Sequence, residues 1–169
     1  VTGGTYIDAT MGNGHDTLFL CELAGKEGQV LAFDIQKQAL ESTRALLKSE
    51  GMEQKARLIL DSHENMAKYV DEASVDGICF NFGYLPGSDH SLATKPESSK
   101  NAVIEGLRLL KKGGVMSLCI YSGGETGFEE RDTLLAYLKS LDEKKYLVIV
   151  SAYYNRKNNP PIPVLIIKK

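Results

Sequence analysis

A glycine-rich segment near the start of the chain is the clearest candidate for chemistry. It reads DATMGNGHDT over residues 8–17 and follows a short apolar run. Glycines let a backbone turn sharply and approach a ligand closely. The helix expected to begin at His15 offers free N–H groups and the positive end of its dipole. The segment therefore predicts a binding site for a ligand that carries a carboxylate.

Asp34 is the second candidate, because it ends the next apolar run, QVLAFD, 20 residues after Gly14. A carboxylate at this distance can accept hydrogen bonds from both ribose hydroxyls of an adenosine. Together the two features predict nucleoside binding, whereas a tight turn followed by an unrelated acid is the alternative. S-adenosylmethionine (SAM) is favoured over NAD, because Thr17 stands where the dinucleotide pattern G-x-G-x-x-G requires its third glycine.

The elements that must position these residues alternate between short apolar strands and helices. The expected strands are Thr5–Ala9, Gln29–Asp34, Ala56–Leu60, Val75–Phe82, Val115–Tyr121, Tyr146–Tyr154 and Val164–Ile167. The expected helices are His15–Ala24, Gln36–Glu50, Asn65–Val70, Pro96–Lys111 and a helix from the capping-box pair Thr126 and Glu129 to Leu141. This alternation predicts an α/β fold whose parallel sheet is covered by helices on both faces. The loop Asn155–Pro163 has no room for a crossover helix, so the last two strands are expected to pair antiparallel.

Composition suits one domain over residues 1–169. The formal net charge of −2 argues against a protein that coats nucleic acid non-specifically. Three widely spaced cysteines predict reduced thiols in a cytoplasmic protein, and three histidines without metal-ligand spacing predict no metal. No apolar run reaches the roughly 20 residues of a membrane span, and no signal peptide is visible. Because the chain does not begin with Met, we allow for natural residues upstream of Val1, such as a helix.

Along nearly all of its length, the chain resembles the class I SAM-dependent methyltransferases. Their first motif, an acid followed by glycines at every second position, is similar to Asp8, Thr10, Gly12 and Gly14, with Thr10 in place of the first glycine. The segment Leu109–Gly114 is similar to the turn that leads into the family's fifth strand. The resemblance implies a Rossmann-like domain with a reversed last strand, and SAM as cofactor.

The same resemblance implies which residues contact SAM. They lie in the glycine segment, after the second and third strands and at the end of the fourth strand. The expected contacts are Asp8, Thr10, Gly12, Asn13, Gly14, Asp16, Thr17, Asp34, Ile35, Gln36, Ser62, His63, Asn81 and Phe82.

Three segments carry a narrower resemblance. They are DATMGNGHDT, NFGYLPGSDHS followed by TKPES, and YSGGETGFEE. They look like the small bacterial family labelled "putative rRNA methylase", whose members are tRNA methyltransferases. The resemblance implies methylation of the amine of 5-aminomethyl-2-thiouridine at the wobble position, with the tRNA anticodon stem-loop as partner. A monomer and a homodimer both remain open.

The end of the fourth expected strand, NFGYLP, is similar to the Asn-Pro-Pro-Tyr motif of amino-group methyltransferases. In that motif an Asn oxygen and a backbone carbonyl accept the amine hydrogens, and an aromatic ring stacks on the base. By position, Asn81 would be the acceptor, Phe82 would supply the carbonyl and Tyr84 would stack. The alternative is that Asn81 caps a turn and Tyr84 packs against the protein.

The loops around this strand end supply further candidates. Asp89 or His90 could take a proton from the substrate ammonium, although a bystander role is equally consistent with an exposed loop. Asn159 lies in an Asn-Pro-Pro-Ile sequence that we interpret as structural. The residues expected to contact the RNA substrate are Tyr84, Pro86, His90, Lys95, Tyr121, Arg156 and Lys157.

Other functions remain open on the sequence alone. A SAM-dependent methyltransferase of rRNA, of a small molecule or of a protein would use the same cofactor, and the acidic charge balance favours a substrate other than RNA. A non-catalytic SAM- or nucleoside-binding subunit is disfavoured because the region around Asn81 is intact. A nucleoside-dependent dehydrogenase is a distant third.

Overall fold

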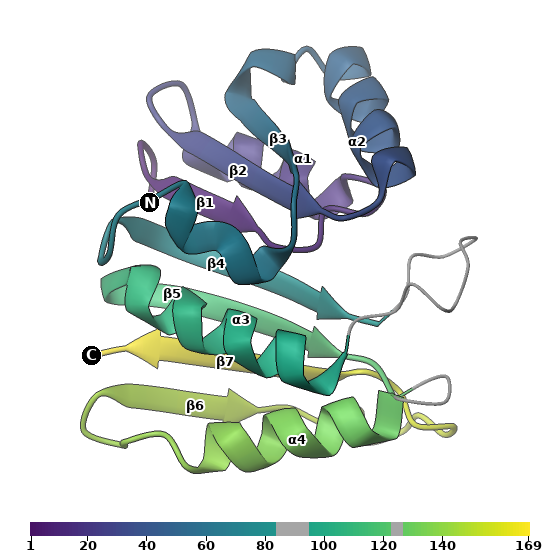
Figure 1. The fold of residues 1–169 in the computed structure, drawn as a ribbon, viewed down its shortest axis with the longest axis vertical. Coiled ribbons are helices and arrows are strands. Elements are labelled where there is room, and N and C mark those ends of the chain that lie inside the picture. Colours follow the sequence, from purple (N-terminus) through teal and green to yellow (C-terminus); the bar gives the residue numbers. More distant parts are fainter. Residues whose placement is uncertain (84–94, 123–126) are drawn as a thin grey trace.

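The computed structural model describes residues 1–83, 95–122 and 127–169, which form a seven-stranded sheet with helices on both faces (Figure 1). The strands are β1 (Thr5–Asp8), β2 (Gln29–Asp34), β3 (Ala56–Leu60), β4 (Val75–Phe82), β5 (Leu110–Ile120), β6 (Tyr146–Val150) and β7 (Ile162–Lys168). The helices are α1 (His15–Ala24), α2 (Lys37–Ser49), α3 (Pro96–Leu109) and α4 (Gly127–Lys139), with 3-10 helices η1 (Glu53–Lys55) and η2 (His63–Lys68).

The strand order is β3-β2-β1-β4-β5-β7-β6. The first five strands pair in parallel, whereas β7 is antiparallel to both of its neighbours, β5 and β6. Figure 1 shows β7 lying between β5 and β6, so the chain leaves the sheet after β6 and returns one position inward. The predicted class I fold, with its mostly parallel sheet and reversed last strand, is confirmed.

Four strands differ from their predicted bounds. β1 ends one residue earlier, at Asp8, and β7 is longer at both ends, from Ile162 to Lys168. β5 begins at Leu110 rather than at Val115, because Leu110 already pairs with Val75 and the intervening residues form an irregularity in the ladder. Gly113 has a φ of 81° within it, a conformation that glycine adopts at no steric cost. β6 ends at Val150 rather than at Tyr154, because its pairing with β7 stops there.

The helix predicted at Asn65–Val70 is the 3-10 helix η2, which begins earlier, at His63. Its start is set by Ser62, whose side chain accepts a hydrogen bond from the Glu64 N–H at 3.3 Å. The start predicted at Thr126 for the next helix lies outside the described residues. Among those residues, no helix is long and apolar enough to cross a membrane.

Alternate residues of the inner strands bury their side chains on opposite faces of the sheet. Ile7 and Phe33 belong to the large cluster under η2, α3 and α4, whereas Tyr6 and Val30 pack with α1 and α2. Near-continuous apolar runs are typical of strands that are buried on both faces. The helices thus leave the carboxyl ends of the parallel strands at one shared edge, where the predicted site residues follow the strands.

Candidate active site

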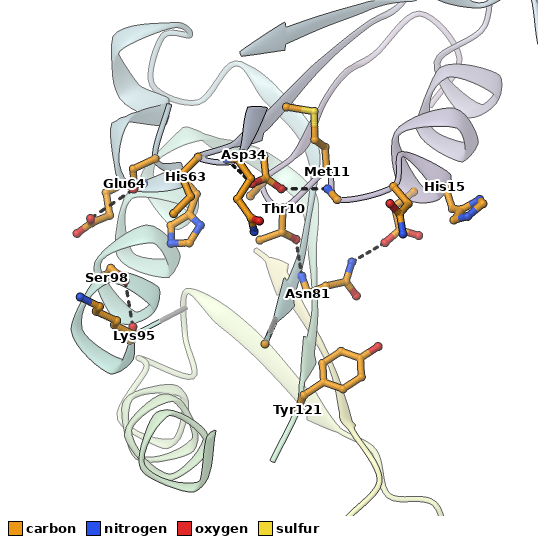
Figure 2. Close-up of a pocket in the computed structure, with 18 of the residues that line it drawn as sticks. Thr10, Met11, His15, Asp34, His63, Glu64, Asn81, Lys95, Ser98 and Tyr121 are labelled. Atoms are coloured by element: carbon orange, nitrogen blue, oxygen red, sulfur yellow. Dashed lines mark hydrogen bonds between the residues drawn. The ribbon is translucent and has the colours of Figure 1, made fainter. Parts of the chain in front are cut away.

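A cavity of about 990 Å³ opens at the carboxyl ends of the parallel strands (Figure 2). Its volume lies at the upper end of the range for cofactor and small-molecule sites. Thirteen of the residues predicted for the site line it: Thr10, Gly12, Asn13, Gly14, Asp16, Asp34, Ile35, Gln36, Ser62, His63, Asn81, Lys95 and Tyr121. The topology therefore brings together residues that are up to 111 positions apart in the chain.

Asp8 and Thr17 lie beneath the glycine segment and do not line the cavity. Asp8 is fully buried, and its carboxylate accepts hydrogen bonds from the Thr17 hydroxyl at 2.6 Å and the Thr10 N–H at 3.2 Å. Burial raises the pKa of the Asp8 carboxyl to about 6, against the effect of these hydrogen bonds. Both residues thus hold the shape of the loop from below.

Gly14 is the position in this loop that most needs glycine. Its φ is 86°, and a Cβ there would lie 2.9 Å from the backbone and side chain of Thr43 on α2. The Thr43 hydroxyl also donates a hydrogen bond to the Gly12 carbonyl at 3.1 Å. α2 therefore packs directly against the loop, and the N-terminus of α1 faces the cavity.

Asp34 joins the two loops that line the cofactor side of the cavity. Its carboxylate accepts hydrogen bonds from the Gly12 N–H at 3.1 Å and the Gln36 N–H at 2.9 Å. Each carboxylate oxygen has further lone pairs. Asp34 can therefore accept hydrogen bonds from a pair of ribose hydroxyls while it keeps these backbone contacts.

His63 lines the cavity at the start of η2, packed edge-on against Phe80 and Phe82. Burial lowers the pKa of its imidazole, so the ring is neutral at pH 7. Its Nε2 is buried and has no hydrogen-bond partner among the described residues. A buried polar atom without a partner costs about 1–3 kcal/mol. This nitrogen fits a ligand with a polar heterocycle, such as the adenine of SAM.

Asn81 is held at both ends by hydrogen bonds (Figure 2). Its backbone N–H donates to the Thr10 hydroxyl at 2.7 Å, and its side-chain Nδ2 donates to the Asp16 carboxylate at 2.7 Å. A carboxylate only accepts hydrogen bonds when ionised, so the amide nitrogen must face Asp16. The amide oxygen, Oδ1, is thereby turned away from Asp16, toward the side of the cavity where Tyr121 lies.

Thr10 replaces the first glycine of the class I motif, and its hydroxyl makes a hydrogen bond that glycine could not make. By accepting the Asn81 N–H, it ties the loop after β1 to the end of β4. Phe82, expected to offer its carbonyl to the substrate, is fully buried and does not line the cavity. Its carbonyl accepts the Tyr121 N–H at 3.0 Å, so it already serves the connection between β4 and β5.

The substrate side of the cavity is only partly within the described residues. Tyr121 lines it, and burial raises the pKa of its hydroxyl to about 12, so the side chain stays protonated at neutral pH. Arg156 and Lys157 are exposed on the loop between β6 and β7 and do not line the cavity. The candidates Tyr84, Pro86, Asp89 and His90 lie outside the described residues.

Several cavity residues were not predicted. Asn159, which was expected to be structural, lines the cavity together with Asn158. Ser98 and Phe128 also line it, from the first turns of α3 and α4. Ser98 lies in the segment TKPES and Phe128 in the segment YSGGETGFEE. The two motifs thus indicated segments that line the cavity, but not which of their residues do so. Within the described part of the chain, no group of three His, Cys, Asp or Glu side chains could hold a metal ion.

Residues 30–167 match the model of a protein family described as "Putative rRNA methylase". The chain belongs to this family. A crystal structure described as a putative rRNA-methylase from Clostridium thermocellum is 44% identical, with a TM-score of 0.96 over 99% of this chain and 90% of that chain. A protein described as a putative methyltransferase from Streptococcus mutans, solved in complex with SAH, is 37% identical, with a TM-score of 0.89 over 99% of this chain and 90% of that one.

A further relative is named tRNA (mnm(5)s(2)U34)-methyltransferase, chloroplastic, from Arabidopsis thaliana. It is 37% identical over 173 residues, which cover 97% of this chain. The chain spans only 62% of the length of this relative. Taken with the two solved structures, the similarity identifies the protein as a SAM-dependent methyltransferase, and the predicted cofactor is confirmed.

Proposed function

We propose that this enzyme methylates the amine of 5-aminomethyl-2-thiouridine at the wobble position of tRNA, forming the 5-methylaminomethyl nucleoside. The orientation of Asn81 carries the proposal, because its amide oxygen faces the cavity while Asp16 holds its nitrogen. The name of the plant relative, tRNA (mnm(5)s(2)U34)-methyltransferase, supports the same substrate.

The nucleophile of this reaction is a primary amine, which must present its lone pair to the methyl group. SAM supplies that methyl group from its sulfonium, in an in-line displacement that leaves the C–S electrons on sulfur. Asn81 Oδ1 accepts one amine hydrogen and so fixes the direction of the lone pair. The product nitrogen then releases one proton to solvent or to a nearby acceptor, which restores a neutral amine.

The opposite side of the cavity holds the cofactor in this proposal. The N-terminus of α1 binds its carboxylate, because the N–H groups of residues 9–12 and 14 already donate to acceptors within the protein. Asp34 accepts hydrogen bonds from the ribose hydroxyls, and His63 Nε2 meets the adenine edge. Each of these roles uses a group whose lone pairs or position are available in the described geometry.

Other substrates are less well supported. The family description names rRNA, and a similar protein is a ribosomal RNA small subunit methyltransferase H from Streptococcus mutans. That similarity covers 47% of this chain, against 97% for the tRNA enzyme, so tRNA is the favoured RNA. A small-molecule, protein or purely binding role has no comparable support. A cytoplasmic location and the choice between monomer and homodimer stay predictions.

The test is methyl transfer in vitro with purified protein, isotopically labelled SAM and tRNA from cells that lack the gene. Nucleoside mass spectrometry should detect conversion of 5-aminomethyl-2-thiouridine to its N-methylated form. Label in another nucleoside would contradict 5-aminomethyl-2-thiouridine as the substrate and would identify the nucleoside that is methylated. SAM binding without any labelled tRNA nucleoside would contradict an RNA substrate. A matched reaction with 16S and 23S rRNA tests the alternative named by the family description.

A further inference from the structure

The loop between β6 and β7, residues 151–161, carries aromatic side chains that do not serve the core. Tyr154 is fully exposed, with a relative exposed area of 104%, and Tyr153 is 46% exposed. A tyrosine exposed to this degree gains nothing from burial of its ring. The stability of the fold therefore does not explain why an aromatic residue stands at position 154.

Basic side chains lie next to these rings. The Arg156 guanidinium lies over the Tyr153 ring, 5.8 Å from its centroid, which occupies one face of that ring. Lys157 follows directly and is exposed. Neither cation forms an ion pair with an acidic side chain among the described residues. Both charges are therefore available to an outside partner.

The loop is also continuous with the cavity. Asn158 and Asn159 line the cavity wall and have φ values of 64° and 49°, which asparagine tolerates better than most residues. Only a few residues thus separate Tyr154 and Arg156 from the site in which Asn81 lies. The loop therefore connects the exposed rings to the cavity wall through Asn158 and Asn159.

Charge along the chain favours a polyanion as that partner. The segment Lys144–Lys169 contains six Lys or Arg residues and no Asp or Glu, although the whole chain has a formal net charge of −2. Arg156 and Lys157 lie in the loop and the other four lie at the opposite end of the hairpin, so no acidic side chain of this segment offsets the charge of the loop. The negative net charge of the whole chain therefore does not argue against an RNA substrate, because the loop itself is positively charged.

We propose that the β6–β7 loop is a platform for single-stranded RNA, in which Tyr154 stacks on an unpaired base beside the target nucleotide. Arg156, held over Tyr153, and Lys157 contact the phosphates of the same strand. Proteins recognise RNA loops through stacking on aromatic side chains combined with backbone contacts. The inference rests on the proposed function for its RNA substrate, but the binding step can be measured without the reaction.

The experiment compares binding of a fluorescent, unmodified anticodon stem-loop by anisotropy. Tyr154→Ala should weaken binding by about 10-fold, whereas Tyr154→Phe should retain it, because stacking requires the ring and not the hydroxyl. A double Arg156→Ala and Lys157→Ala variant should bind more weakly and show a shallower dependence of affinity on salt. SAM affinity, measured by calorimetry, should be unchanged in all three variants.

Matched controls separate the loop from general surface effects. Phe19→Ala removes an aromatic side chain that is 60% exposed on α1, and Lys144→Ala removes an exposed cation before β6, at the far end of the hairpin. Both should bind the stem-loop as the unaltered protein does. Equal affinity for the unaltered protein and Tyr154→Ala would overturn the inference, as would loss of affinity of the same size in the two controls.

The two proposals fail in different ways. A stem-loop that binds through Tyr154 but is never methylated in its aminomethyl form would support the platform and contradict the proposed reaction. Methylation of tRNA with an unchanged KM for tRNA in Tyr154→Ala would support the reaction and overturn the platform. Absence of stem-loop binding by the unaltered protein would also overturn the platform.

Discussion

On the cofactor wall of the cavity, formed by the glycine segment and Asp34, polar groups of the chain bind one another. Asp34 accepts two backbone N–H groups, and Asp8 supports the loop from below. On the substrate wall, formed by Asn81, Tyr121 and the β6–β7 loop, most side chains are exposed, and Tyr121 is 43% exposed. A cofactor that is the same in every turnover suits a pre-organised wall, whereas a large substrate that arrives from outside suits exposed side chains.

Asn81 lies at the border of the two walls, and its replacement should have the largest effect. Asn81→Ala removes the oxygen that we assign to the amine, so kcat should fall about 100-fold, a loss typical of a misaligned nucleophile. SAM affinity should change little. Single-turnover kinetics with saturating SAM, together with calorimetric titration of SAM, measure both quantities.

Asn101→Ala is the matched control, because Asn101 is exposed on α3 and does not line the cavity. It should leave kcat unchanged. Equal losses of turnover and SAM affinity in Asn81→Ala would contradict this assignment. They would show that Asn81 serves the cofactor rather than the substrate amine.

Asp8 tests how the cofactor wall is supported. Its pKa rises from 3.8 to about 6 on folding, so protonation favours the folded state. The resulting stabilisation is complete below pH 3.8 and is lost as the pH rises to about 6, by up to about 3 kcal/mol. Asp8→Asn keeps an acceptor for Thr10 and does not titrate. Urea unfolding between pH 4 and 7 should show this decline in the unaltered protein and not in the variant.

Asp34 tests the face of the cofactor wall that meets the ligand. Asp34→Ala should weaken SAM binding by about 30-fold, because two hydrogen bonds to a charged acceptor are lost. At saturating SAM, kcat should stay close to that of the unaltered enzyme. A fall in kcat without loss of SAM affinity would contradict the assignment of Asp34 to the ribose.

Thr10 joins the two walls, and its replacement should have the smallest effect. Thr10→Ala removes the acceptor of the Asn81 N–H and should reduce kcat about fivefold, the equivalent of one hydrogen bond of about 1 kcal/mol. Thr10→Ser keeps the hydroxyl and should restore activity. The same loss in Thr10→Ser would show that the methyl group, rather than the hydrogen bond, matters at this position.

Local spacing is what made the cofactor wall predictable. The glycine segment and Asp34 belong to one β-α-β unit, so their distance in sequence fixes their distance in space. The spacing of the glycine segment did not reveal which of its side chains face the cavity. Asp8 and Thr17 are buried under the loop and bind each other instead. Sequence patterns identify a motif by residue type, whereas contact with a ligand depends on the direction of each side chain.

The substrate wall was harder to predict, because it depends on pairing between distant strands. Asn159 reaches the cavity only because β7 pairs with β5, and no local pattern around Asn159 encodes that return. The start of β5 at Leu110 has a similar origin, since the partner residue Val75 decides it. Pairing between distant strands thus determines both the start of β5 and the position of Asn159, and the periodicity of the sequence predicted neither.

The insertion of β7 between β5 and β6 has a consequence for biosynthesis. β6 pairs only with β7 among the described strands, so this part of the sheet stays open until Ile162–Lys168 has emerged from the ribosome. The β1–α1–β2 unit emerges much earlier, and the contacts within it join residues that are near in sequence. A nascent chain would thus acquire its nucleotide pocket before the hairpin that we assign to RNA, and would bind its small ligand before its large one.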